Sequence, residues 1–334
     1  MGLFEKFAKE LPNVAGKVFV ITGTTSGTGY VAAETVAKHG GEVVLLNRPS
    51  ERSTASLKKL RAAVPDATFV PISCDLMDFS SVRAACAEIK EKYDTIYCLS
   101  NNAGIMMTPD EATKDGFDKQ MQVNHLSHFL ITKELFPLIL NGAKKFDDAR
   151  IVQHSSLARS NTVNGKLEEK YFAANGGNLG GDPHLENGGS PFSGPPMHRY
   201  CQTKLANSVF SYALHDKLQS SSNDSEQCKK IRAIAAHPGI SKTSLLDHMK
   251  SGFFTRKIIF PAVAFFMFQC AEDGAMGLIK GMMDSNVESG KLYGPPKLKG
   301  NAILIPPEPY ETDEESKKML WKMSEEATGV IFDI

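Results

Sequence analysis

Tyr200 and Lys204 stand four positions apart in the stretch YCQTK, and this spacing puts both side chains on one face of a helix. A free tyrosine has a pKa of about 10 and exchanges protons poorly at neutral pH. A nearby ammonium favours the phenolate and lowers that pKa, so the phenol can give a proton to a carbonyl oxygen or take one from an alcohol. Because most Tyr-x-x-x-Lys pairs lie on helix surfaces, the other motifs of the chain must decide whether this pair is catalytic.

A glycine-rich turn follows the first apolar segment, in KVFVITGTTSGTGY. Gly23, Gly27 and Gly29 permit a tight turn in which the backbone approaches a phosphate closely. The helix that follows offers N–H groups and the positive end of its dipole to an anion. The spacing G-x-x-x-G-x-G differs from the common G-x-G-x-x-G, but its place after a first strand predicts a site for the phosphates of a dinucleotide. The other residues of this turn expected to bind the cofactor are Thr25, Ser26 and Thr28.

The end of the second apolar strand, in LLNRPS, bears on which dinucleotide binds. An acidic residue there would accept hydrogen bonds from the adenosine ribose of NAD. Asn47 is neutral instead, and the guanidinium of Arg48 can pair with a 2′-phosphate. The sequence therefore favours NADP over NAD, and the alternative interpretation is a solvated arginine at a strand end.

The segments that must position these residues alternate between strands and helices. Apolar stretches predict strands, the last of them an edge strand, at residues 17–22, 42–47, 68–73, 95–100, 150–156, 231–237 and 291–294. Helical patterns lie between them up to residue 39, at 51–63, at 79–92 and in a long helix that ends near residue 140. Such alternation implies βαβ units, so we expect an α/β fold with a doubly wound, Rossmann-type parallel sheet covered on both faces.

Residues 1–334 are expected to form a single domain with its core at 16–300. Residues 160–197, rich in Gly, Asn and Pro, predict an inserted loop, which is either a lid or an ordinary surface insertion. Residues 219–230 predict a polar surface loop. An apolar segment at 247–270 and a C-terminal extension at 301–334 complete the chain.

Charge and cysteine usage exclude several classes of function. Lys plus Arg equals Asp plus Glu at 38 each, so the neutral chain gives no reason to expect nucleic-acid binding. The six cysteines form no Cys-x-x-Cys pair, and His125, His128 and His154 form no convincing metal set, so we expect no metal site. Free cysteines fit the cytoplasm or another reducing compartment.

The N-terminal stretch MGLFEKFAKELPNV lacks the long apolar run and cleavage site of a secretory signal, so we expect the chain not to be secreted. Leu3, Phe4 and Phe7 share one helical face. We favour a short helix packed on the domain, with a peripheral membrane contact as the alternative. The longest apolar run, 258–268, falls short of the roughly 20 residues that a membrane-spanning helix needs.

Several motifs in register resemble those of the short-chain dehydrogenases/reductases. They are the turn Thr22-Gly23-x-x-x-Gly27-x-Gly29, NNAG at 101–104, Ser156 and Tyr200-x-x-x-Lys204. The stretches CDL (74–76), VNHLSHF (123–129) and HPGISKTSL (237–245) look most like the retinol-dehydrogenase-like branch. The resemblance covers roughly residues 16–245.

The resemblance implies roles for individual residues. Asn124 would support a water relay at a break in its helix, and Ser156, rather than Ser155, would hydrogen-bond the substrate oxygen beside Tyr200. Lys204 and Tyr200 would also contact the cofactor. The remaining cofactor contacts would be Asp75 and Leu76 at the adenine, Asn102, Ala103 and Gly104 at the ribose, and Pro238, Gly239 and Thr243 at the nicotinamide end.

Together the motifs predict an NADP(H)-dependent oxidoreductase that interconverts an alcohol and a carbonyl, with Tyr200 as general acid/base. The family resemblance makes 247–270 a cap over the substrate pocket, and its apolar character implies a lipophilic small molecule such as a retinoid, steroid, isoprenoid or pigment precursor. Core packing or a homo-oligomer contact explains this segment equally well. Ser156 and Tyr200 lie 44 residues apart, farther than is usual for the family. The chain resembles the light-dependent protochlorophyllide reductases in carrying a long segment here, so light-driven tetrapyrrole reduction stays open. A non-catalytic NADP-binding scaffold is a further alternative.

Overall fold

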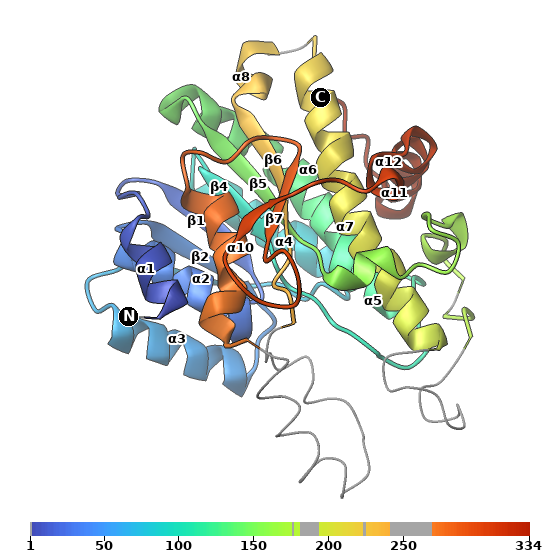
Figure 1. The fold of residues 1–334 in the computed structure, drawn as a ribbon, viewed down its shortest axis with the longest axis horizontal. Coiled ribbons are helices and arrows are strands. Elements are labelled where there is room, and N and C mark those ends of the chain that lie inside the picture. The colour runs from blue at the N-terminus through green and yellow to red at the C-terminus, as the bar shows by residue number, and fades with distance from the viewer. Residues whose placement is uncertain (1, 176, 181–193, 223–224, 241–268) are drawn as a thin grey trace, which may run out of the picture.

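An eight-stranded sheet forms the centre of the computed structural model, which describes residues 2–175, 177–180, 194–222, 225–240 and 269–334 (Figure 1). Its strands lie in the order β3-β2-β1-β4-β5-β6-β7-β8. Their bounds are β1 Val18–Thr22, β2 Glu42–Asn47, β3 Phe69–Ser73, β4 Cys98–Asn101, β5 Ala149–His154, β6 Ile231–Ala236, β7 Lys291–Gly294 and β8 Ile303–Ile305. All neighbouring pairs from β3 to β7 are parallel, and β8 pairs antiparallel with β7. The predicted doubly wound α/β fold is confirmed.

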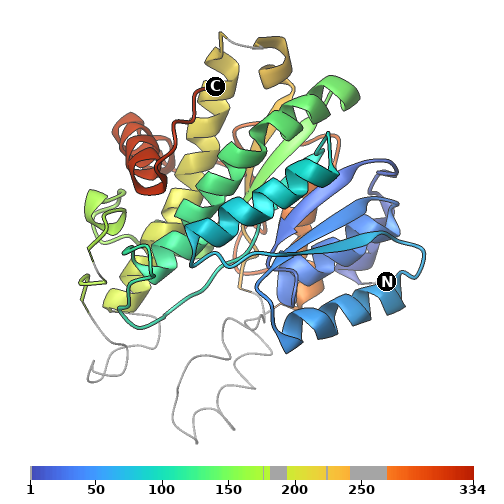
Figure 2. The ribbon, with the colours of Figure 1, turned by 180° about the vertical axis from the view of Figure 1, so that it is seen from behind.

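Helices cover both faces of this sheet (Figures 1 and 2). The longer helices are α2 Gly27–Lys38, α3 Glu51–Ala63, α4 Phe79–Lys92, α6 Ser127–Phe146, α7 Pro195–Ser220, α10 Ala271–Met283 and α12 Glu314–Thr328. The shorter ones are α1 Leu3–Lys9, α5 Lys119–Met121, α8 Ser225–Lys229, α11 Pro309–Thr312, the π-helical turn η1 Gln122–Leu126 and the 3-10 helices η2 Leu157–Ser160 and η3 Glu169–Tyr171.

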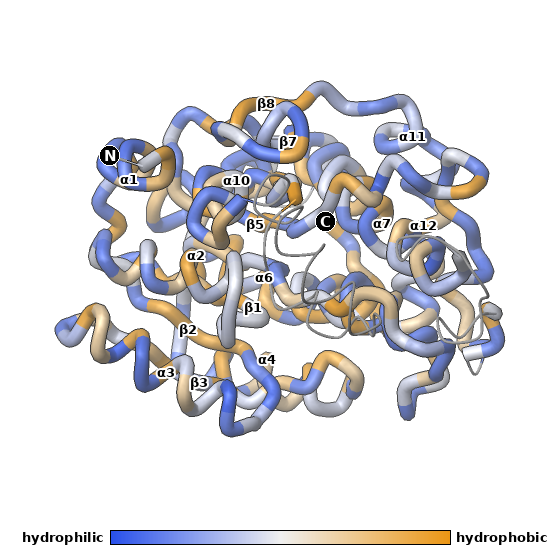
Figure 3. The backbone as a smooth tube through the Cα atoms, turned by 60° about the horizontal axis from the view of Figure 1, so that its bottom comes forward, coloured by the Kyte–Doolittle hydropathy of each residue, from blue (hydrophilic) through white to orange (hydrophobic). Residues whose placement is uncertain are grey.

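Each face of the sheet has its own hydrophobic core. One core joins the sheet to α4, α6 and α7 and includes the fully buried Leu130 and Val209. The other joins it to α2 and α10 and includes Val36 and Ile279. Burying one such side chain stabilises the fold by about 1.5–3 kcal/mol, which explains why the strands are hydrophobic along most of their length (Figure 3).

Three predicted boundaries are wrong by two residues or more. β5 ends at His154 rather than at residue 156. The other two differ for local reasons. β4 begins at Cys98 rather than residue 95, because the Ile96 N–H donates to the Leu138 carbonyl of α6 at 3.0 Å instead of to a strand. α6 continues to Phe146 rather than ending near residue 140. α6 passes close to the sheet at Gly142, where a Cβ would lie 2.0 Å from the Ile96 carbonyl oxygen. The helix continues through this glycine because the missing side chain permits the close contact.

The predicted strand at residues 291–294 is confirmed as β7, but its predicted place at the edge of the sheet is wrong, because β8 pairs on its outer side. Ile303 and Leu304 of β8 are 45% and 44% exposed, so this strand lacks the buried, apolar signature of the others. The predicted loop at 219–230 includes the end of α7 and the short helix α8. Only tertiary pairing distinguishes such short elements from a turn.

The N-terminal helix α1 packs on the domain, as favoured from its sequence. Phe4 and Phe7 lie against the core that contains α2 and α10, and the Phe4 N–H donates to Asp273 Oδ1 of α10 at 3.2 Å. Among the residues that the structure describes, no helix combines the length and the apolar character needed to cross a membrane.

The described part of the predicted inserted loop packs onto the domain. Leu167, Tyr171 and Phe172 are buried in the core beneath α6 and α7. Most of the predicted cap, residues 247–268, and residues 181–193 of the predicted loop lie outside the described residues. The C-terminal extension forms β8, α11 and α12, and α12 buries Leu320 and Trp321 against α6 and α7.

Candidate active site

The glycine-rich turn joins the end of β1 to the start of α2. Gly23 and Gly27 have φ angles of +72° and +59°, which disfavour any residue with a Cβ. Gly23 also lies against Ala103, where a Cβ would approach the Ala103 Cα to 2.8 Å. At Gly29 a Cβ would lie 2.3 Å from Asn102 Nδ2. The three glycines therefore let the turn close against the segment that follows β4.

The start of α2 fits an anion. Ser26 is the N-cap residue, but its side chain does not cap the helix, so it leaves the first helical N–H groups to other partners. These groups and the helix dipole are the elements that hold a phosphate in dinucleotide-binding folds. The residues present thus fit the pyrophosphate of a nicotinamide dinucleotide.

Asn47, at the end of β2, fastens the turn to the sheet. Its Oδ1 accepts the Thr24 N–H at 2.8 Å and its Nδ2 donates to Thr24 Oγ1 at 2.7 Å. Arg48 is exposed beside it, and Arg52 in the first turn of α3 donates to Ser26 Oγ. Arg52 is not among the residues predicted from the sequence. Its position four residues after Arg48 indicates a second guanidinium near the same strand end.

Asn102 organises the polar groups beneath the turn. Its Nδ2 donates to the carbonyls of Thr22 at 2.8 Å and Gly23 at 3.2 Å. Its Oδ1 accepts from Thr28 Oγ1 at 3.0 Å and bonds His154 Nδ1 at 2.7 Å, so His154 carries its proton on Nδ1. Burial lowers the pKa of His154 to about 3, so the ring is neutral. Thr28 stands between the last two glycines, where the family that this turn resembles usually has an apolar residue. Its hydroxyl is satisfied by the hydrogen bond to Asn102.

Asn124 lies in the π-helical turn η1, where the helix widens, and is fully buried. Its Oδ1 accepts the Ile105 N–H at 2.8 Å, and its Nδ2 donates to the Ile105 carbonyl and to Thr203 Oγ1, both at 2.9 Å. The side chain thereby holds the loop after Gly104 against α7. Its predicted role in a water relay stays a prediction.

Tyr200 and Lys204 come from the second and third turns of α7. This helix begins with Pro195 and Pro196, which favour helix starts, directly after Gly194 at φ 83°. Arg199, the residue before Tyr200, is fully buried, forms an ion pair with Asp118 at 3.2 Å and donates to the Thr108 carbonyl at 2.8 Å. The start of α7 is therefore anchored to the loop between β4 and α5.

The two serines after β5 have different partners. Ser155 Oγ donates to the Lys204 carbonyl at 2.7 Å, within the backbone of α7. The side chain of Ser156 lies beside Tyr200 and lowers the pKa of its phenol, and Ser156 Oγ accepts the Ala158 N–H at 3.2 Å. The structure thus brings Ser156, and not Ser155, to the phenol of Tyr200.

The expected lowering of the phenol's pKa by Lys204 is wrong for the protein by itself. Burial raises the pKa of Tyr200 to about 12, against the opposing effect of the nearby Ser156 side chain. Burial also lowers the pKa of Lys204 to about 7, so the amine is only partly charged at neutral pH. Lys204 Nζ lies 5.8 Å from the centre of the Tyr200 ring and donates to the His154 carbonyl at 2.8 Å. Desolvation therefore dominates both groups.

The other predicted residues follow the carboxyl ends of their strands. Asp75 and Leu76 come after β3, where Asp75 Oδ1 accepts the Met77 N–H at 3.0 Å. Pro238 and Gly239 come after β6, and Gly239 has a φ of +62°. Thr243 lies outside the described residues. Ligands of open α/β sheets bind at the carboxyl edge, near the point where the strand order reverses. In this sheet that point lies between β1 and β4, so these positions are consistent with a single binding site there.

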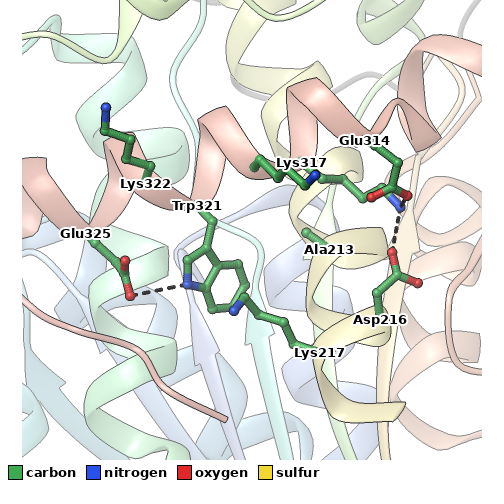
Figure 4. A pocket seen from close by; sticks show the side chains of 9 residues that line it. Ala213, Asp216, Lys217, Glu314, Lys317, Trp321, Lys322 and Glu325 are labelled. Carbon is green, nitrogen blue, oxygen red and sulfur yellow. Dashed lines mark hydrogen bonds and ion pairs between the residues drawn. The ribbon is translucent and has the colours of Figure 1, made fainter. Parts of the chain in front are cut away.

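A surface cavity of about 310 Å³ lies elsewhere, between α7 and α12 (Figure 4). It is lined by Lys217, Lys317 and Trp321 among others, and it contains none of the residues predicted to act in catalysis. We therefore place the candidate active site at the carboxyl edge of the sheet, and not in this cavity.

The sheet topology and this site define a dinucleotide-binding α/β oxidoreductase fold. The family model described as short chain dehydrogenase matches residues 17–177. The chain is 30% identical over 319 residues to the short-chain dehydrogenase/reductase drtF of Aspergillus calidoustus, covering 95% of each. It is 30% identical over 328 residues to retinol dehydrogenase 14 of Mus musculus, covering 95% of this chain and 87% of the relative. The chain belongs to the short-chain dehydrogenase family.

A solved structure of another protein has the same fold. The crystal structure of 3-ketoacyl-(acyl-carrier-protein) reductase from Brucella melitensis, complexed with NADH, superposes with a TM-score of 0.60 at 21% identity. The match covers 84% of this chain and 96% of that one. At this identity the likeness supports the fold.

Proposed function

We propose that this chain is an NADP(H)-dependent oxidoreductase that interconverts an alcohol and a carbonyl on a lipophilic substrate. The observation that carries the proposal is the placement of the Ser156 side chain beside Tyr200, one helical turn from Lys204 and at the strand edge that holds the glycine-rich turn. A nicotinamide dinucleotide, when bound, supplies or accepts the hydride at the substrate carbon.

Tyr200 is proposed as the proton donor in the reducing direction. A pKa of about 12 keeps the phenol protonated at neutral pH, and this is the form that donates to a carbonyl oxygen. Ser156 donates a second hydrogen bond to the same oxygen and so fixes the carbonyl in place. Lys204 changes protonation near pH 7, which suits a group that restores the proton on Tyr200 after each turnover.

The preference for NADP rests on the charge around the second strand. Arg48 and Arg52 supply two guanidinium groups for a 2′-phosphate, and Asn47 supplies no carboxylate that would repel it. Because the side-chain amide of Asn47 is hydrogen-bonded to Thr24, it is not available to bind the ribose. The phosphates themselves would be held by the start of α2.

The lipophilic substrate is inferred from the side chains around Tyr200. Met106 and Met197 pack against Tyr200 and Ala158 in one apolar cluster. Methionine is flexible and polarizable, so such walls accommodate apolar molecules of varied shape. Several relatives are retinol dehydrogenases, which supports a retinoid or a molecule of similar polarity as the first substrate to test.

The test is a substrate screen with the full-length protein in the dark. Retinaldehyde, a steroid ketone and a small polar aldehyde would be offered with NADPH or NADH, and cofactor oxidation would be followed at 340 nm, or product by chromatography for retinaldehyde. We expect dark turnover of an apolar carbonyl with kcat/KM at least about tenfold higher for NADPH than for NADH. No turnover with any carbonyl or alcohol would favour a scaffold, and turnover only under light would favour tetrapyrrole chemistry.

A further inference from the structure

A buried ion pair connects the C-terminal extension to the segment that carries Ser156. Arg159 Nε donates to Glu311 Oε1 at 2.8 Å, and the two side chains are 6% and 0% exposed. Arg159 Nη1 donates in turn to the carbonyl of Ser156 at 3.1 Å. We propose that Glu311 acts through Arg159 as a positioning residue for Ser156; this inference rests on the proposed function of that serine.

Glu311 is itself held firmly. It lies in the short helix α11, and its second oxygen, Oε2, accepts the Glu308 N–H at 3.0 Å. Both carboxylate oxygens thus have donors, and the carboxylate cannot rotate away from Arg159 without losing one of them. A buried guanidinium that lost this partner would be left uncompensated in the interior, so the pair constrains where Arg159 can lie.

The position of Arg159 matters because Ser156 has no regular structure to hold it. Ser156 lies two residues after the end of β5 and is the N-cap residue of η2. Its carbonyl accepts the Arg159 N–H at 3.2 Å as well as the guanidinium. These two bonds fix the carbonyl, and through it the direction in which Oγ leaves the backbone toward Tyr200.

A role in stability alone would not require this arrangement. α12 is already fastened to α7 by the ion pair of Lys317 with Asp216 at 2.5 Å (Figure 4) and by the packing of Trp321. Neither contact involves Ser156. The Glu311–Arg159 pair is distinct in joining the extension to the backbone of a proposed catalytic residue, across 152 positions of sequence.

The decisive experiment is a double-mutant cycle between Glu311→Gln and Ser156→Ala, with Lys317→Ala as the matched control in the same extension. Assays would be run well below the lowest melting temperature of the set. Glu311→Gln is expected to lower kcat about tenfold with KM for NADPH unchanged, because only the placement of Ser156 is disturbed. In the Ser156→Ala background the same change should lower kcat less than about twofold. Lys317→Ala should leave kcat unchanged.

A second readout does not depend on residual activity of Ser156→Ala. In crystal structures, Ser156 Oγ should lie farther from Tyr200 Oη in Glu311→Gln than in the wild type, and its position should be unchanged in Lys317→Ala. If Glu311→Gln does not fold, Arg159→Lys keeps the charge pair and removes the donor to the Ser156 carbonyl, and it should show the same losses.

Equal losses from Glu311→Gln in both backgrounds, or an equal loss in Lys317→Ala, would overturn the proposal. If the wild-type protein turned over no carbonyl or alcohol, the proposed function would fail first. The positioning claim would then be decided by crystal structures of the wild type and Glu311→Gln: it stands if Ser156 Oγ has moved away from Tyr200 Oη, and it falls if the two structures agree there.

Discussion

The cofactor half and the catalytic half of the candidate site are built in opposite ways. Beneath the glycine-rich turn, every polar atom of the Asn102 side chain is hydrogen-bonded, and His154 beside it is neutral. Around Ser156, burial raises the pKa of Tyr200 to about 12 and lowers that of Lys204 to about 7. The first half is a satisfied network around a histidine that burial keeps neutral, whereas in the second half burial keeps Tyr200 protonated and leaves Lys204 only partly charged at neutral pH.

This difference between the two halves indicates which of them exchanges protons. A saturated network stabilises a shape before any ligand arrives. In the catalytic half the pKa of Lys204 is displaced to about 7, where the group can exchange a proton at neutral pH. The comparison can be tested by changing one group at a time in each half.

The largest effect is expected from Tyr200→Phe, which removes the proton donor and little else. We expect kcat to fall by about a thousandfold, while the dissociation constant for NADPH changes by less than about threefold. Stopped-assay kinetics and fluorescence titration would measure the two. Tyr93→Phe, which removes a hydroxyl bonded to Glu42 far from the site, is the matched control. Undiminished turnover in Tyr200→Phe would end the acid/base account.

Gly23→Ala tests the cofactor half. The new Cβ must adopt a positive φ and also approach Ala103, so we expect NADPH affinity to fall by about a hundredfold and the fold to be destabilised. Gly165→Ala is the control, because Gly165 has a φ of +61° but nothing within 4 Å. It should cost about 1–2 kcal/mol of stability and leave NADPH affinity unchanged. Equal affinities in both variants would show that the close approach at Ala103 is unimportant.

The pH dependence of stability tests the catalytic half. The folded pKa of Lys204 is about 7 and the unfolded value is near 10.5, so between these pH values the unfolded chain binds the extra proton. Stability contributed by this group therefore rises with pH in that window. From pH 7 to 9 the cofactor-free wild type should gain about 2 kcal/mol relative to Lys204→Met, by chemical denaturation. Parallel profiles would mean that Lys204 is not desolvated.

The smallest effect is expected at the second strand. Arg52→Ala and Arg48→Ala should each raise KM for NADPH about tenfold and leave KM for NADH within about twofold, because only NADPH carries the 2′-phosphate. Arg61→Ala, at the far end of α3, should change neither. Steady-state kinetics with both cofactors would measure this. If KM for NADH rose as much as KM for NADPH, these arginines would not be binding the 2′-phosphate.

Much of the cofactor half could be predicted from the sequence because its signals are local. Gly23, Gly27 and Gly29 lie within seven residues, and the apolar strands beside them show their burial directly in their composition. The choice of Ser156 over Ser155 came from the family resemblance, which rests on the short stretch around these two serines. Such features depend on the chain over a few residues, so a single sequence contains them.

Only the tertiary structure could decide the rest. The pKa values of Tyr200 and Lys204 depend on how completely α7 is buried, and the predicted sign for Tyr200 was wrong because spacing says nothing of desolvation. The pairing of β8 with β7 and the contact of Arg159 with Glu311 join segments far apart in the chain. The sequence determined which elements form and which chemistry they carry; long-range packing decided their proton affinities and partners, since those depend on everything that excludes water.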